Sequence, residues 1–176
     1  TGTLNINNSQ ALGTAAGTFT LTGGIIDNTS GADITTVNYP LALNGDFTYS
    51  GSIPRNLNLG TGTTTLNADR QITVSAGTLT LGGAISASAR NLTKSGGGTL
   101  SFGSSAVALN NLTIGAGTLI SANATGSLSF AGDFTNNGSF THNSGTVTFS
   151  GSTQSIGGSS ATTFNNVVLS GGAVTK

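Results

Sequence analysis

Short segments in which apolar residues alternate with threonine or serine recur along the whole chain, and each ends at glycine, serine or asparagine. Examples are residues 18–21, 78–81, 99–102 and 145–149. A period of two places apolar side chains on one face of a β-strand and hydroxyl side chains on the other. No segment shows the 3.6-residue period of an amphipathic helix. The chain is therefore predicted to be all-β, with residues such as Leu79 and Leu100 pointing inward.

The composition agrees with folded β-structure and excludes several other classes of protein. Of 176 residues, 28 are glycine, 35% are hydrophobic and only 6% are charged. Disordered chains usually combine high charge with few β-branched and aromatic residues, whereas Thr, Val, Ile and Phe recur here. A net charge of zero gives no electrostatic footprint for nucleic acid, and the absence of cysteine excludes disulfides and redox chemistry. No apolar run is long enough to insert into a membrane as a helix.

A repeated unit, Gly-Thr or Gly-Ser followed by an apolar residue, recurs at spacings of roughly 15 to 21 residues, which suit one turn of a repeat architecture. In a β-solenoid each turn is one unit that stacks on the next. A β-sandwich also uses short strands and frequent turns, so it remains the alternative. The repeated unit begins at Gly2, Gly17, Gly77, Gly98, Gly117, Gly126, Gly138 and Gly145.

Residues 58–86 resemble an autotransporter-associated β-strand repeat. Residues 91–100, Asn-Leu-Thr-Lys-Ser-Gly-Gly-Gly-Thr-Leu, are similar to that family's Leu-Thr-Lys-x-Gly-x-Gly-Thr-Leu signature, and residues 132–149 and 163–167 resemble repeats of bacterial secreted surface proteins. The resemblance implies a right-handed parallel β-helix from a large exported bacterial protein. At about 20 residues per coil, residues 1–176 would form a single β-solenoid segment of about eight or nine coils.

The two termini carry parts of the same signature. Residues 174–176 are similar to residues 92–94, and residues 1–4 are similar to residues 98–100. A repeat excised from a longer array would show this, as would a subunit whose ends meet those of its neighbours. Both ends also read as strands without a polar cap, and open strand edges template further pairing. We therefore expect an end-to-end interface, formed by Thr1, Gly2, Thr3, Leu4, Ala173, Val174, Thr175 and Lys176.

The sequence indicates no catalytic, metal or cofactor site. His142 is the only histidine, it lacks a nucleophile-elbow context, and one histidine does not make a metal cluster. Asp27 and Asp33 are the pair best placed by sequence to act as the acid and base of a polysaccharide-cleaving β-helix. Both, however, lie in turn-forming sequence. We therefore expect no enzyme activity and no cofactor.

Thr-x-Thr pairs support a different alternative, an ice-binding solenoid. Such a protein needs pairs in register on a flat face. The pairs at residues 18–20, 78–80 and 146–148 are about 60 residues apart instead of one per coil. This spacing favours ordinary solvent-facing threonine.

The predicted function is structural. We expect a non-catalytic protein of the extracellular space or the bacterial cell surface, a fibre-forming or adhesin segment that associates end to end. Its expected partners are further copies or neighbouring repeats of itself, with a surface glycan, a host surface or a biofilm component as a further contact. No nucleic acid and no membrane insertion by this segment are expected. The alternative is an ice-binding or a polysaccharide-binding or -cleaving β-helix.

Overall fold

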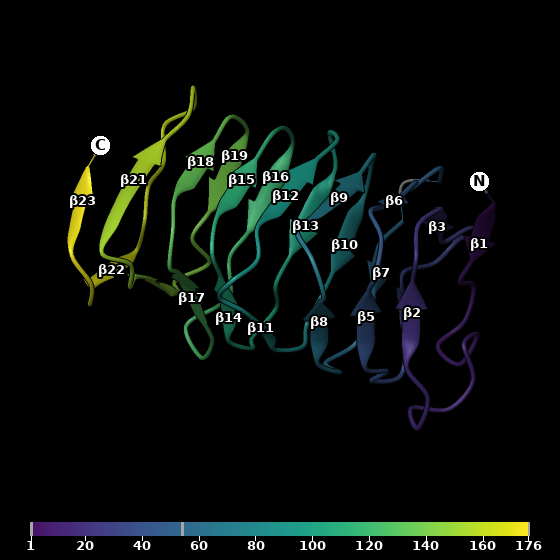
Figure 1. Cartoon of the computed structure of the whole chain (residues 1–176). Coiled ribbons are helices and arrows are strands. Elements are labelled where there is room, and N and C mark those ends of the chain that lie inside the picture. Colours follow the sequence, from purple (N-terminus) through teal and green to yellow (C-terminus); the bar gives the residue numbers. More distant parts are fainter. Residues whose placement is uncertain (1, 54, 176) are drawn as a thin grey trace.

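The structure is a computed structural model that describes residues 2–53 and 55–175. In these residues all regular structure is short parallel strand, wound into a β-solenoid of about eight turns (Figure 1). Three parallel sheets, which we call A, B and C, run along the solenoid axis. The predicted parallel β-helix is therefore confirmed, and the β-sandwich alternative is wrong.

Each interior turn contributes one strand to each sheet. Sheet A consists of β1 (Thr3–Asn5), β3 (Ile25–Asp27), β6 (Phe47–Tyr49), β9 (Arg70–Val74), β12 (Leu92–Ser95), β15 (Leu112–Ile114), β18 (Phe134–Asn136), β21 (Thr153–Gly157) and β23 (Ala173–Thr175). Sheet B consists of β2 (Phe19–Leu21), β5 (Leu41–Leu43), β8 (Thr64–Leu66), β11 (Ile85–Ala87), β14 (Val107–Leu109), β17 (Ser127–Phe130), β20 (Thr146–Phe149) and β22 (Asn166–Leu169). Sheet C consists of β4 (Ile34–Thr35), β7 (Leu57–Asn58), β10 (Thr78–Thr80), β13 (Thr99–Ser101), β16 (Thr118–Ile120) and β19 (Ser139–Thr141).

The turns are longer than the spacing of the repeated sequence unit. Residues in register in neighbouring turns are between 19 residues apart, from Leu128 to Val147, and 25 residues apart, from Thr48 to Thr73. The repeated unit gives shorter spacings because it precedes strands of all three sheets, so that successive copies are often less than one turn apart.

The alternating pattern places one ladder of apolar side chains inside each sheet. In sheet C, for example, Leu79, Leu100 and Leu119 are in register in successive turns, and none of the three has exposed surface. This burial removes most of the apolar surface from water and is the main stabilising contribution to a stack of turns.

Near the C-terminal end, aromatic rings fill the core. Five phenylalanines of the last turns pack in edge-on or tilted contacts, with ring centroids 5.3 to 5.9 Å apart. Aromatic pairs favour these geometries over stacked rings. The five are Phe130, Phe134, Phe140, Phe149 and Phe164.

Candidate functional site

The two ends of the solenoid are the sites that the sequence predicts, and they lie at opposite ends of the molecule (Figure 1). Thr3 and Leu4 belong to β1, the first strand of sheet A, and Ala173 and Thr175 belong to β23, the last strand of the same sheet. Gly2 precedes β1, and Val174 is the central residue of β23. Thr1 and Lys176 lie outside the described residues.

At the N-terminal end, sheets A and B each finish in an open edge. In the described part of the chain, β1 pairs on one side only, with β3, and β2 pairs on one side only, with β5. Leu4 is in register with the buried Ile26 and so occupies an inward position. It is nevertheless 44% exposed because it belongs to the outermost turn.

The third corner of this end is covered. Residues 7–17 form turns instead of a sheet C strand, and they cross the end of the solenoid next to β4. Val37 donates its backbone N–H to the Ser9 carbonyl at 3.0 Å, and the Tyr39 hydroxyl donates to the Gly13 carbonyl at 2.7 Å. The expectation that neither end carries a cap is therefore wrong for this corner, where neutral residues form the cover.

The C-terminal end has the same arrangement. Among the described residues, β22 pairs only with β20, and β23 pairs only with β21. Val167 and Leu169 are in register with buried residues of β20, yet they are 47% and 59% exposed. The open edge of sheet B at this end is thus strongly apolar.

A second loop covers the sheet C corner at the C-terminal end. Residues 158–165 run beside β19 without forming a strand. Asn136 donates its side-chain amide to the Thr162 hydroxyl at 2.9 Å and to the Ala161 carbonyl at 3.2 Å. Phe164 packs its ring against Phe140. Both ends therefore present open edges of sheets A and B and a loop over the corner of sheet C.

The similarity between the termini and the internal signature does not extend to their positions in the solenoid. In residues 91–100, the Leu-Thr-Lys part lies on β12 in sheet A, and the Thr-Leu part lies on β13 in sheet C. Residues 3–4 instead lie on β1 in sheet A, the sheet that also contains β23. The register within sheet A carries the position of Thr3 from turn to turn until, in the turn of β23, it lies four residues after Thr175. β23 and β1 therefore occupy different parts of one strand position in sheet A, and two copies that meet end to end would continue the solenoid.

A buried lysine, which the sequence analysis missed, lies inside the solenoid on β12. Lys94 has no exposed surface. Its ammonium donates to the backbone carbonyls of Ser95 at 3.0 Å, Ala116 at 2.9 Å and Gly96. Burial lowers the pKa of Lys94 from 10.5 to about 8, because the ammonium loses its hydration. The three carbonyls satisfy its donors and connect two successive turns.

Lys94 should make the chain more stable as the pH rises from 8 to 10. In this range the unfolded chain keeps a proton that the folded chain has lost, so the free energy of unfolding increases with pH. Tyr49 has the opposite effect, because burial and the nearby carboxylates Asp27 and Asp33 raise its pKa to about 12. Its effect begins only near the ordinary tyrosine pKa of 10. Urea unfolding of the wild type should show a gain of about 1–2 kcal/mol between pH 8 and 10.

The matched control for this measurement is Lys94→Met, which should lose that pH-dependent gain whatever its absolute stability. The same rise in both proteins between pH 8 and 10 would show that another group is responsible.

The aspartates proposed as an acid and base are engaged by neighbouring segments. Asp27 is buried and accepts from the N–H groups of Asn28 at 2.9 Å and Ser52 at 3.3 Å, and also from the Ser52 hydroxyl. Asp33 accepts from the backbone and side-chain N–H groups of Asn56 at 3.0 and 2.8 Å. These hydrogen bonds, the backbone one first, lower the pKa of Asp33. Asp33 is therefore poorly suited to be the protonated acid that a polysaccharide-cleaving mechanism needs.

His142 lies in a turn. Its Nδ1 accepts from the backbone N–H of Ser144 at 3.0 Å, and the next two residues, Asn143 and Ser144, have left-handed φ angles of 50° and 58°. Among the residues that the structure describes, no group of three or more histidine, cysteine or acidic side chains is placed to hold a metal ion.

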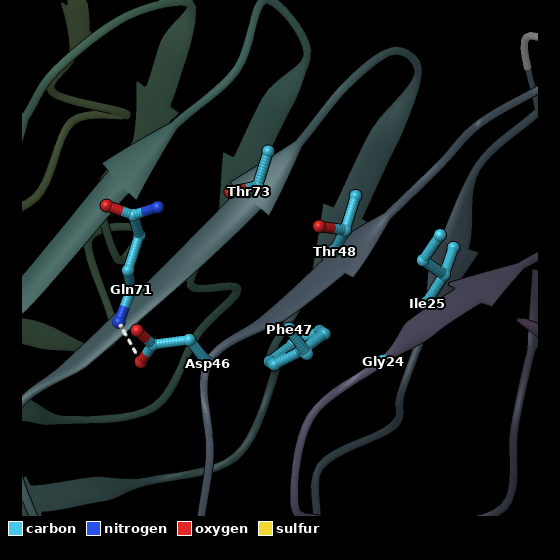
Figure 2. A pocket seen from close by; sticks show the side chains of 7 residues that line it. All are labelled: Gly24, Ile25, Asp46, Phe47, Thr48, Gln71 and Thr73. Atoms are coloured by element: carbon cyan, nitrogen blue, oxygen red, sulfur yellow. Dashed lines mark hydrogen bonds between the residues drawn. The ribbon is translucent and has the colours of Figure 1, made fainter. Parts of the chain in front are cut away.

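A groove on the outer face of sheet A runs across β3, β6 and β9 (Figure 2). Ile25, Thr48 and Thr73 follow one another along it, and Asp46 accepts from the backbone N–H of Gln71 at 2.8 Å. Among the described residues that line the groove, only Asp46 is ionisable. One carboxylate does not form an acid–base pair, so the groove gives no basis for hydrolytic chemistry.

Hydroxyl side chains form two rows on the outer face of sheet C. Each of the strands β10, β13, β16 and β19 contributes one outward residue to each row, in register with the strands of the neighbouring turns. The Thr-x-Thr pairs at residues 18–20 and 146–148 lie at strands of sheet B, and only the pair at 78–80 lies in sheet C. The rows of sheet C recur once per turn because serine takes the place of threonine in them. One row contains Thr78, Thr99, Thr118 and Ser139, and the other contains Thr80, Ser101, Ile120 and Thr141.

Comparison with protein-family models, curated proteins and solved structures finds no match. In the described part of the chain, no helix has the length and apolar character needed to cross a membrane. The open edges of sheets A and B at the two ends are the most distinctive feature of the described residues.

Proposed function

We propose that this chain is a non-catalytic structural module of the bacterial cell surface that stacks end to end into filaments. The observation that carries the proposal is the match between its two ends. Each end leaves open the edges of sheets A and B and covers the corner of sheet C. A second copy that is shifted along the axis therefore brings β2 of one copy next to β22 of the other. Because sheet A has one strand more than sheet B, the same shift places β23 and β1 end to end at one level of sheet A.

The energetics of such a contact are favourable. Open edges provide unpaired backbone donors and acceptors, and parallel pairing satisfies them. Val167, Leu169 and Leu4 supply exposed apolar surface at inward positions, which the next turn would bury. A net charge of zero gives no long-range repulsion between copies. Because the two contacting surfaces differ, the contact is heterologous and open, and it yields filaments rather than closed rings.

The proposal also covers location, activity and adhesion. The cell-surface location follows from the resemblance to autotransporter-associated repeats. The hydrogen bonds that engage Asp27 and Asp33 favour a protein without catalytic activity. An adhesive contact between the outer faces and a surface glycan is compatible with their many hydroxyl and amide side chains.

Light scattering of the purified chain tests the stacking directly. We expect the mean mass to rise with protein concentration, and unbranched filaments one solenoid wide to appear in negative-stain electron microscopy. A strictly monomeric chain at high concentration would contradict the proposal.

The hydroxyl rows of sheet C favour a second candidate, an ice-binding module. They place pairs of hydroxyls at ~4.8 Å intervals along the axis, the regular spacing that a flat sheet offers to a lattice. The rows extend over four turns, from β10 to β19, and Ile120 interrupts one of them. Thermal hysteresis of the dilute chain decides this case, and Thr99→Lys, which places a long charged side chain in one row, should abolish any effect.

A further inference from the structure

The corner before each strand of sheet B contains a column of positions that stack from turn to turn. Near the start of the sheet B strands, one residue per turn forms a row in register: Phe19, Leu41, Thr64, Ile85, Val107, Leu128, Val147 and Val167. Each position of the column lies two residues before a member of this row. Five of the eight are glycine. We call them the corner column; from the first turn to the last it contains Gly17, Tyr39, Gly62, Gly83, Ser105, Gly126, Gly145 and Asn165.

In the interior turns, close approach of the preceding turn requires these glycines. A β-carbon on Gly62 would lie 2.0 Å from the carbonyl oxygen of Tyr39, and one on Gly83 would lie 1.7 Å from that of Gly62. One on Gly145 would lie 2.2 Å from the carbonyl oxygen of Ala122. Contacts this short do not occur between real atoms, so any side chain here would push two turns apart.

Gly17 occupies the same column in the first turn, but nothing in the chain requires glycine there. No atom lies within 4 Å of the position that its β-carbon would take, and its φ is outside the left-handed region. Gly13, in contrast, has a φ of 93°, and this backbone conformation alone favours glycine there. Glycine also costs conformational entropy on folding. Gly17 is thus the residue type that close approach of a preceding turn requires, although its own turn is the outermost one.

We infer that Gly17 receives the backbone of Asn165, the last member of the corner column, from a second copy of this chain. This inference rests on the proposed stacking and fixes its register. The second copy is the occupant that fits, because the column supplies the matching position at its other end. The adjoining edges, β22 and β2, contain no charged residue, so their contact does not desolvate a charge.

The test compares three variants by light scattering and thermal unfolding. Gly17→Ala and Gly17→Val should keep the melting temperature of the dilute chain, because their side chains enter open space. Both should weaken association at least tenfold, because their β-carbons would meet the incoming carbonyl. Ser86→Thr is the matched control: it adds one methyl group to an exposed position in the middle of sheet B and should change neither property.

Each outcome has a separate meaning. A wild type that stays monomeric would overturn the stacking itself. A wild type that associates, together with Gly17 variants that associate equally well, would overturn only this register. A lower melting temperature of the dilute Gly17→Ala chain would show that its own residues pack at this site, and would also overturn the inference. Gly62→Ala should lower the melting temperature, which shows that the assay detects a glycine that the fold requires.

Discussion

Mixing two single-cysteine variants, Thr20→Cys and Val168→Cys, under mild oxidation should give a disulfide-linked dimer. Thr20 and Val168 are the first and last members of one outward row of sheet B, in register with Ala42 and Thr148. Head-to-tail stacking in this register places them opposite each other at ~4.8 Å, which is within the range of Cα separations that disulfides bridge. The chain has no native cysteine, so a non-reducing gel reads the result without background.

The controls for this experiment give the direction of stacking. On the non-reducing gel each variant alone should give only the single-chain band, whereas the double variant should give a ladder of disulfide-linked multimers. A dimer of Thr20→Cys alone would indicate that N-terminal ends meet, and a dimer of Val168→Cys alone would indicate that C-terminal ends meet. Thr65→Cys lies in the middle of the same row and is exposed, so mixing it with Thr20→Cys should give no product above random collision.

Replacing Leu100 with Asp should destabilise the folded chain by about 3–5 kcal/mol, because it leaves an unpaired carboxylate in the core. Leu100 has no exposed surface and lies between Leu79 and Leu119 in the ladder of sheet C. Thr80→Asp changes an outward residue of the same sheet and should cost only about 0.5 kcal/mol. Urea midpoints measure both effects at neutral pH. Equal losses for the two variants would contradict the assigned strand faces.

The strand faces could be predicted because alternation is local. The pattern Thr78-Leu79-Thr80 determines which side chain points inward whatever the rest of the chain does. The length of a turn could not be predicted in the same way. It depends on three corners of variable length, such as the connection from β6 to β7, which contributes to the 25-residue shift between β6 and β9.

Lys94 shows what a pattern of residue types leaves out. It shares an inward face with Leu92, and the alternation therefore places it in the core, but a charged side chain there is unexpected without a partner. Its partners are carbonyl groups of the chain itself, which every sequence contains. The glycines around the contact, at residues 96–98, 115 and 117, are the one signal that backbone could come close enough.

The covered corners were also missed for a physical reason. Residues 7–17 and 158–165 contain no charges and no Pro, and they differ from the strands only in lacking alternation. A cap is usually sought as a polar or charged segment. Here the covers are neutral, and they protect one corner while the other two edges stay open.

The loop at each sheet C corner also determines how a stack would respond to tension. Backbone hydrogen bonds between turns run along the solenoid axis, so pulling on the ends stretches all the bonds between two turns together. Interior turns are joined through three sheets, whereas a junction between copies is joined only through A and B. The junction is therefore the weakest cross-section, and a stretched filament should break between copies and leave each chain folded. Shear in flowing liquid would then shorten such filaments in steps of whole chains, and every fragment would keep two ends able to rejoin.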